Sequence, residues 1–165
     1  KDGEGRSSIF SPQLKEKKPA ISHETETRSM AKSELILRAI DTIGLEREGS
    51  KRGFKWYKSG NGDIVHLKYS KHYERNNIYW YGITPESIIY ADEIGITHFG
   101  LVIGEEGCVL VDIDTMKRYN SEAKTSPHSD GSVRHYHLFI SPGPNPEPFH
   151  YNSKSKFDSV FVPFN

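Results

Sequence analysis

The chain has 165 residues, and its 22 Lys and Arg are balanced by 22 Asp and Glu, so the formal net charge is zero. This length suits one domain with its own core and leaves little room for two. The sequence holds no run of 18 apolar residues and opens with KDGEGRSS, which lacks the pattern of a secretory signal. We therefore expect a cytoplasmic protein without membrane contact.

The single cysteine, Cys108, excludes an intramolecular disulfide and favours a reducing compartment. It lies in the apolar run CVLV, which predicts a buried thiol rather than a nucleophile. Residues 1–30 combine mixed charge with few large apolar side chains, a composition typical of a flexible, disordered tail or linker. Because the sequence begins with Lys1 rather than Met, we expect a piece of a larger protein.

Residues 31–165 predict a single α+β domain with two or three helices and a mostly antiparallel or mixed sheet. Apolar residues recur at helical spacing over residues 29–45, and Gly44 is expected to cap the end of that helix. Strands are predicted at residues 54–58, 63–70 and 77–83, with a turn at Gly60–Gly62 between the first two.

Further along the chain, Pro85 and Gly95 mark the beginning and end of a second helix. Residues 99–103 and 108–113 predict a hairpin, after which Asp114 is expected to be the N-cap of a short helix. A last strand is predicted at residues 133–141. The segment 141–150 is rich in proline and is expected to lie across the surface.

Residues 51–82 are basic and aromatic in an otherwise neutral chain, with a local net charge of +5. The cations are Lys51, Arg52, Lys55, Lys58, Lys68, Lys71 and Arg75. Because cations neutralise phosphates and flat rings stack on bases, the stretch predicts a nucleic-acid surface. Trp56, Tyr73 or Trp80 is expected to stack on a base, with Trp56 at the surface beside the cations and Trp80 in a more apolar strand. The alternative is a solvated strand face whose aromatics fill a β core.

The histidines of Arg134-His135-Tyr136-His137 predict a second polar site. His135 and His137 are two residues apart and share a strand face, a spacing that suits zinc or an acid–base pair. A third ligand is expected from His98, His128 or His150. The alternative is an ordinary half-exposed strand in which Arg134 and His135 contact phosphates.

The predicted order of helix, three strands, helix and strand resembles the core of the PD-(D/E)XK nucleases, which includes many restriction enzymes. The resemblance implies carboxylates that bind a divalent metal such as Mg²⁺ and activate water. The nearest match is Asp63 followed by His66-x-Lys68, with Glu34 on the preceding helix as an extra ligand. His66 stands where the family has an acid. A metal-dependent endonuclease is therefore the alternative hypothesis.

The segments LKYSKHYE, YWYGI, HFGLVIGEEGCVLVDIDTM and HYHLFI resemble accessory domains of prokaryotic restriction and homing-type endonucleases. This resemblance implies DNA as the partner and a nuclease domain in the same or a partner chain. The leading hypothesis is thus a DNA-binding module of a restriction or mobile-element endonuclease, without a cofactor or catalytic residues of its own. RNA in place of DNA, and a protein-interaction domain for an acidic partner, are the further alternatives.

Overall fold

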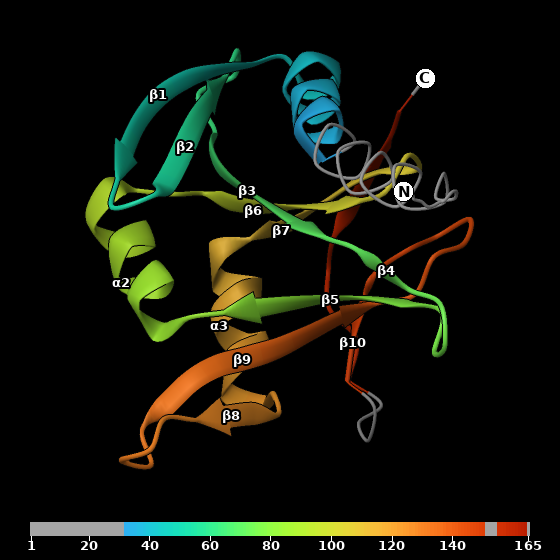
Figure 1. Ribbon diagram of the computed structural model, residues 1–165. Helices are drawn as coiled ribbons and strands as arrows, with labels where there is room; N and C mark the ends of the chain where they lie inside the picture. The colour runs from blue at the N-terminus through green and yellow to red at the C-terminus, as the bar shows by residue number, and fades with distance from the viewer. Residues whose placement is uncertain (1–31, 151–154, 165) are drawn as a thin grey trace, which may run out of the picture. The chain divides into compact units, whose positions relative to one another are not determined.

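The computed structural model describes residues 32–150 and 155–164. The predicted tail, residues 1–30, lies outside the described residues. The described residues from Leu35 onward form one compact unit, in which strands make up two sheets and helices cover them (Figure 1). The fold class is therefore α+β, as the sequence predicts.

The larger sheet has six strands in the order β1-β2-β3-β6-β7-β11. Its strands are β1 (Leu45–Lys51), β2 (Phe54–Ser59), β3 (Ile64–Ser70), β6 (His98–Ile103), β7 (Gly107–Asp112) and β11 (Val160–Pro163). β3 and β6 are parallel, and every other neighbouring pair is antiparallel. The sheet is therefore mixed, with its one parallel pair at the centre.

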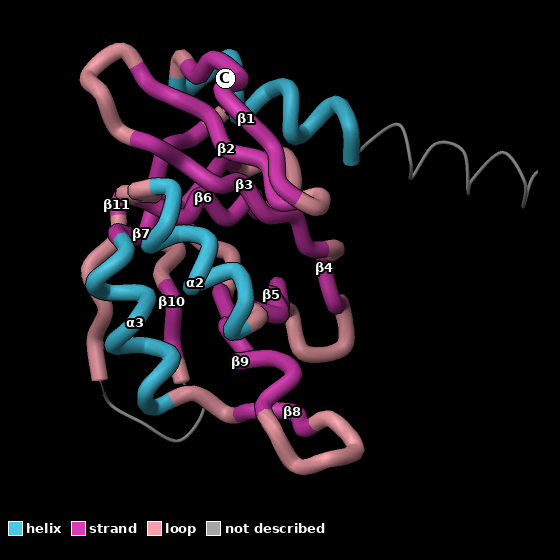
Figure 2. The backbone as a smooth tube through the Cα atoms, turned by 90° about the vertical axis from the view of Figure 1, so that its left-hand side faces the viewer, coloured by secondary structure: helices cyan, strands magenta, loops and turns pink. Residues whose placement is uncertain are grey.

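The smaller sheet has five strands, all antiparallel, in the order β10-β9-β5-β4 with β8 added to β9. Its strands are β4 (His72–Tyr73), β5 (Ile78–Ile83), β8 (Thr125–Pro127), β9 (Val133–Ile140) and β10 (Pro148–Phe149). Two helices, α2 (Pro85–Ile94) and α3 (Ile113–Glu122), lie beside each other next to the sheets (Figure 2).

The main core lies between the two sheets and these two helices. It includes Tyr81 and Ile83 from β5, Phe99 and Leu101 from β6, and Met116 from α3, none more than 1% exposed. Each such side chain contributes roughly 1.5–3 kcal/mol by leaving water. The core thus joins both sheets and both helices into one unit.

The opposite face of the six-stranded sheet is covered by residues 35–43 of the first helix, which spans residues 32–43. Leu35 and Ala39 of this helix pack against Val102 and Cys108 in a second core cluster. Because side chains alternate along a strand, Val65 of β3 faces the helix side and the residues on either side of it face the main core.

The ends of the helices are set by capping residues, and one predicted cap is wrong. Thr84 caps α2 by accepting a hydrogen bond from the Ser87 N–H at 3.1 Å, and Gly95 ends the helix at φ 86°, as predicted. Helix α3 is capped by Asp112 and not by Asp114, because the Asp112 carboxylate accepts from the Thr115 N–H at 2.8 Å. Asp114 lies in the first turn, where a negative charge favours the helix dipole.

The expectation that segment 141–150 lies across the surface is wrong in part. Pro146, Pro148 and His150 are buried, and Pro148–Phe149 pairs with β9 as strand β10. Strands β1, β4, β8 and β11 were also not predicted. Among the described residues, no helix is both long enough and apolar enough to cross a membrane.

Candidate nucleic-acid interface

The predicted cations do not lie on one continuous strip. Lys51, Arg52 and Lys55 are exposed around the β1–β2 turn beside α2, whereas Lys58 is exposed toward the other end of β2. Lys51 Nζ lies 3.1 Å from Glu93 Oε1 and 4.9 Å from the centre of the Tyr90 ring, so α2 already neutralises part of its charge.

A second basic group lies on the β4–β5 hairpin, which is at the opposite side of the view from the β1–β2 turn (Figure 1). Lys71 Nζ lies 4.9 Å from the centre of the Tyr73 ring, and the Tyr73 side chain is exposed. Arg75, in the turn of the hairpin, is also exposed. The hairpin therefore presents an aromatic ring and two cations to solvent.

A group of three aromatic side chains lies on strands β5 and β9. It consists of Trp80, His135 and His137, and we call it the Trp80 cluster. The ring centres of His135 and His137 lie 6.0 and 5.4 Å from the Trp80 ring, both edge to face. All three side chains are half-buried and lie on the face of β5 and β9 that points away from the main core. A Cβ at Gly82 would lie 2.9 Å from both Trp80 and His135, so glycine lets these rings approach each other.

Nearby positive charges affect the histidines of the Trp80 cluster. Burial lowers the pKa of His135, and the charges of Arg134, His137, Lys68 and His128 lower it further. Burial also lowers the pKa of His137, with a contribution from Lys124. Both imidazoles are therefore held neutral near pH 7 by surroundings that are apolar and positive. The structure thus brings Lys68, Trp80, Arg134 and His135, which were predicted from separate segments, into one neighbourhood.

The expected placement of the two tryptophans is reversed. Trp56 is half-buried and packs against the main core, and its indole lies over Gly49 of the neighbouring strand, where a Cβ would be 2.2 Å from the ring. Trp80, expected in a more apolar strand, lies on the outer face instead. Trp80 is therefore the better candidate for contact with a base.

The residues of the alternative nuclease site do not come together. Asp63 precedes β3 and lies 4.0 Å from His98 Nδ1, in a small pocket that Val65 also lines. His66 points to the other face of β3, where its ring stacks on Phe54 at 3.8 Å. Since Lys68 shares that face with His66 by strand alternation, Asp63 and the His66-x-Lys68 pair lie on opposite faces of the strand. Glu34 is exposed on the first helix.

His66 is buried and is held by contacts with the backbone and with core side chains. It is 7% exposed, its Nδ1 lies 2.7 Å from the carbonyl oxygen of Lys55, and Phe99 approaches its ring edge to face. Burial lowers the pKa of His66 to about 4, so the ring is neutral at pH 7 and its Nδ1–H donates to the Lys55 carbonyl.

The predicted zinc pair is on one strand face, as expected, since His135 and His137 both contact Trp80. Of the three expected third ligands, His98 is beside Thr97 and Asp63, and His150 stacks on Tyr119 at 4.0 Å. His128 is exposed, and its charge contributes to the lowered pKa of His135. In residues 32–150 and 155–164, no group of three or more His, Cys, Asp or Glu side chains could hold a metal ion.

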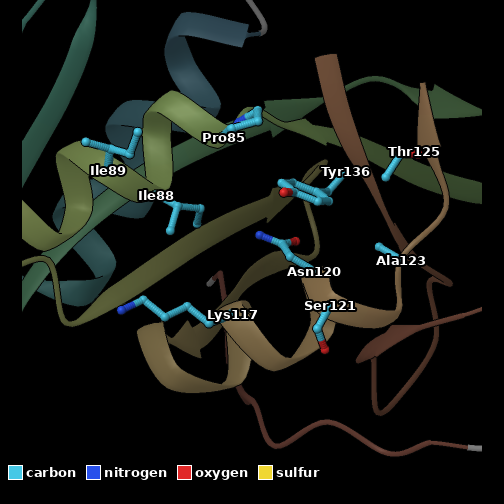
Figure 3. Close-up of a pocket in the computed structure, with 9 residues that line it drawn as sticks. All are labelled: Pro85, Ile88, Ile89, Lys117, Asn120, Ser121, Ala123, Thr125 and Tyr136. Atoms are coloured by element: carbon cyan, nitrogen blue, oxygen red, sulfur yellow. The ribbon is translucent and has the colours of Figure 1, made fainter. Parts of the chain in front are cut away.

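A pocket that sequence reasoning missed lies between α2, α3 and the β8–β9 hairpin (Figure 3). Its volume is about 570 Å³, and Asn120 and Tyr136 are among its lining residues. One signal in the sequence points to it. Met116, Tyr119, Asn120 and Ala123 follow the spacing of a buried helix face, and Asn120 is the amide among them.

Comparisons of the chain with protein-family models, with curated proteins and with solved structures find no match.

Proposed function

We propose that this chain is the DNA-binding module of a restriction or mobile-element endonuclease, with the Trp80 cluster and its surrounding cations as the contact surface. The observation that carries the proposal is that Trp80 of β5 packs edge to face on His135 of β9, while Arg134 and Lys68 are near enough for their charges to act on that histidine. Cations bind backbone phosphates, and an indole between them stacks on a base. The sequence resemblance to endonuclease accessory domains supplies the biological setting.

The exposed pair Lys71 and Tyr73 on the β4–β5 hairpin extends this surface along the same sheet, because β4 pairs with β5. The cations around the β1–β2 turn belong to the other sheet and have a smaller role in the proposal. Lys51 is already paired with Glu93 there.

Fluorescence anisotropy with labelled single-stranded DNA, duplex DNA and RNA tests the proposal. Arg134→Gln should weaken binding and lower the slope of log affinity against log salt by about 0.9, the value for one phosphate contact. Trp80→Ala should cost about 1–3 kcal/mol of binding if the indole stacks on a base. Arg47→Gln, which removes an exposed cation from β1, is the matched control and should leave both quantities unchanged.

Binding should also depend on pH through the Trp80 cluster. His135 is held neutral in the free protein, and a phosphate beside it favours the charged form, so DNA binding takes up a proton. Affinity should therefore rise as the pH falls from 7.5 to 6, and His135→Gln should reduce that rise. Equal affinity of Arg134→Gln, Trp80→Ala and the parent, at every pH, would contradict the proposal and favour a protein partner.

The metal-dependent endonuclease has less support, because Asp63 and His66 lie on opposite faces of β3. We expect the chain to leave DNA intact with Mg²⁺ or Mn²⁺. Cleavage that disappears in Asp63→Ala would establish the nuclease instead.

A further inference from the structure

The pocket between α2, α3 and the β8–β9 hairpin has a mixed lining, with apolar side chains from α2 and polar ones from α3 and β8. Ile88 of α2 and the ring of Tyr136 of β9 form opposite sides, and Asn120 of α3 lies between them (Figure 3). At the rim, Lys117 is paired with Asp92 at 2.7 Å. The other lining residues carry no charge, so the lining suits a neutral ligand better than a charged one.

Asn120 is the unusual member of this lining. The residue is 8% exposed, and neither its Nδ2 nor its Oδ1 has a hydrogen-bond partner among the described residues. Figure 3 shows its amide end directed into the space between Ile88 and Tyr136. Buried amides in proteins are nearly always paired, so an unpaired one directed into a pocket marks a place where a ligand supplies the partners.

The carboxamide offers a donor and an acceptor side by side. The edge of a nucleobase presents the same pair in complementary order: adenine, for example, places the N6 amino group next to the N7 acceptor, and Asn is its usual bidentate partner. The flat face of a base packs on an aromatic ring such as Tyr136 and on an aliphatic side chain such as Ile88.

We infer that this pocket binds a nucleobase, with its edge paired to the Asn120 carboxamide and its face against Tyr136. The inference rests on the proposed function, in which the base comes from DNA. Tyr136 and His135 are neighbours on β9 and point to opposite faces, so the pocket and the Trp80 cluster lie on the two sides of one strand. A base that has left the stack and a free nucleoside present the same edge.

Free nucleosides test the pocket without DNA. Adenosine, guanosine, cytidine and thymidine are titrated separately into ¹⁵N-labelled protein, and we expect saturable shifts of the Asn120 side-chain amide with at least one of them. Purine riboside, which keeps the ring but lacks an exocyclic group, should bind roughly tenfold or more weakly, since it offers no second hydrogen bond. Asn120→Asp and Asn120→Leu should weaken binding by a similar factor.

Ser121→Ala is the matched control variant. Ser121 lines the same pocket, but its hydroxyl donates to the Arg118 carbonyl oxygen at 2.7 Å, so its loss should leave nucleoside binding unchanged. If Asn120→Leu fails to fold, two measurements still test the role of Asn120 in binding. They are nucleoside binding by Asn120→Asp and the comparison of adenosine with purine riboside on the parent chain.

The results of these experiments test the base pocket and the proposed function independently of each other. Absence of saturable shifts with all four nucleosides overturns the base pocket, even when DNA binding depends on Arg134. Equal binding of purine riboside, or full binding by both Asn120 variants, overturns it as well. Nucleoside binding that requires Asn120, in a protein that does not bind DNA, supports the pocket and refutes the proposed function.

Discussion

The buried histidine His66 should make the stability of this protein fall as the pH is lowered. Its pKa is about 4 in the folded chain and 6.5 when exposed, because burial disfavours the charged ring. The unfolded chain therefore binds the proton more readily than the folded one. The stabilising contribution is fully present above pH 6.5 and is lost as the pH falls toward 4.

The size of this effect follows from the difference between the two pKa values. The whole difference corresponds to about 3 kcal/mol, and about 2 kcal/mol of it is lost between pH 7.5 and 5. The histidines His135, His137 and His150 also have lowered pKa values and act in the same direction, so the parent protein should lose more than His66 alone explains.

His66→Phe isolates the contribution of this residue. A phenyl ring keeps the stacking on Phe54 and the contact with Phe99, but it carries no proton. Urea unfolding at pH 7.5, 6.5, 5.5 and 5 gives the free energy of unfolding of each protein. We expect the variant to lose about 2 kcal/mol less than the parent over this range, whatever its stability at pH 7.5.

Val65→Ala is the control, because Val65 is buried on the same strand as His66 but has no side chain that titrates. It should reproduce the pH dependence of the parent. If His66→Phe also reproduces that dependence, the buried, neutral state of His66 is refuted.

Three further outcomes follow from the packing. Burial raises the pKa of the Cys108 thiol to about 12, so a disulfide reagent should label it only after unfolding, and rapid labelling of the native protein would contradict its burial. Gly82→Ala places a Cβ 2.9 Å from the Trp80 ring and should cost about 1–3 kcal/mol in urea unfolding; an unchanged midpoint would show that the ring moves freely. Tyr119→Phe removes a hydroxyl that donates to the Phe149 carbonyl oxygen at 2.7 Å and accepts from the Phe139 N–H at 3.2 Å, and the loss of these hydrogen bonds should cost about 1–3 kcal/mol by the same assay.

Elements whose ends are marked by local chemistry were predictable from the sequence. Helix α2 is the clearest case, since a capping threonine, a proline in the first turn and a left-handed glycine at the end act within a few residues of each other. Strand β1, with the sequence LEREGSK, was not predictable, because only Leu45 is buried and the strand exists through its pairing with β2. Its polar residues show no period of their own.

The placement of the candidate site needed the tertiary structure. Strand β5 reads IYWYGI and is apolar on both faces, so alternation alone could not show that Tyr79, Tyr81 and Ile83 point inward and Trp80 outward. The gathering of Lys68 with Arg134 depends on how the two sheets pack, which no local pattern records. The Asn120 pocket depends likewise on the arrangement of α2, α3 and β9.

The six-stranded sheet is completed late, and this has a consequence for synthesis of the chain. β7 ends at Asp112, whereas its edge partner β11 begins only at Val160. Gly107 allows the close approach of the two strands, since a Cβ there would lie 2.3 Å from the Val162 carbonyl oxygen. A nascent chain that has not yet reached β11 therefore exposes the apolar edge of β7, a template for pairing with another chain. Ribosomes that stall in this interval should release aggregation-prone products, whereas chains that include β11 close the edge themselves.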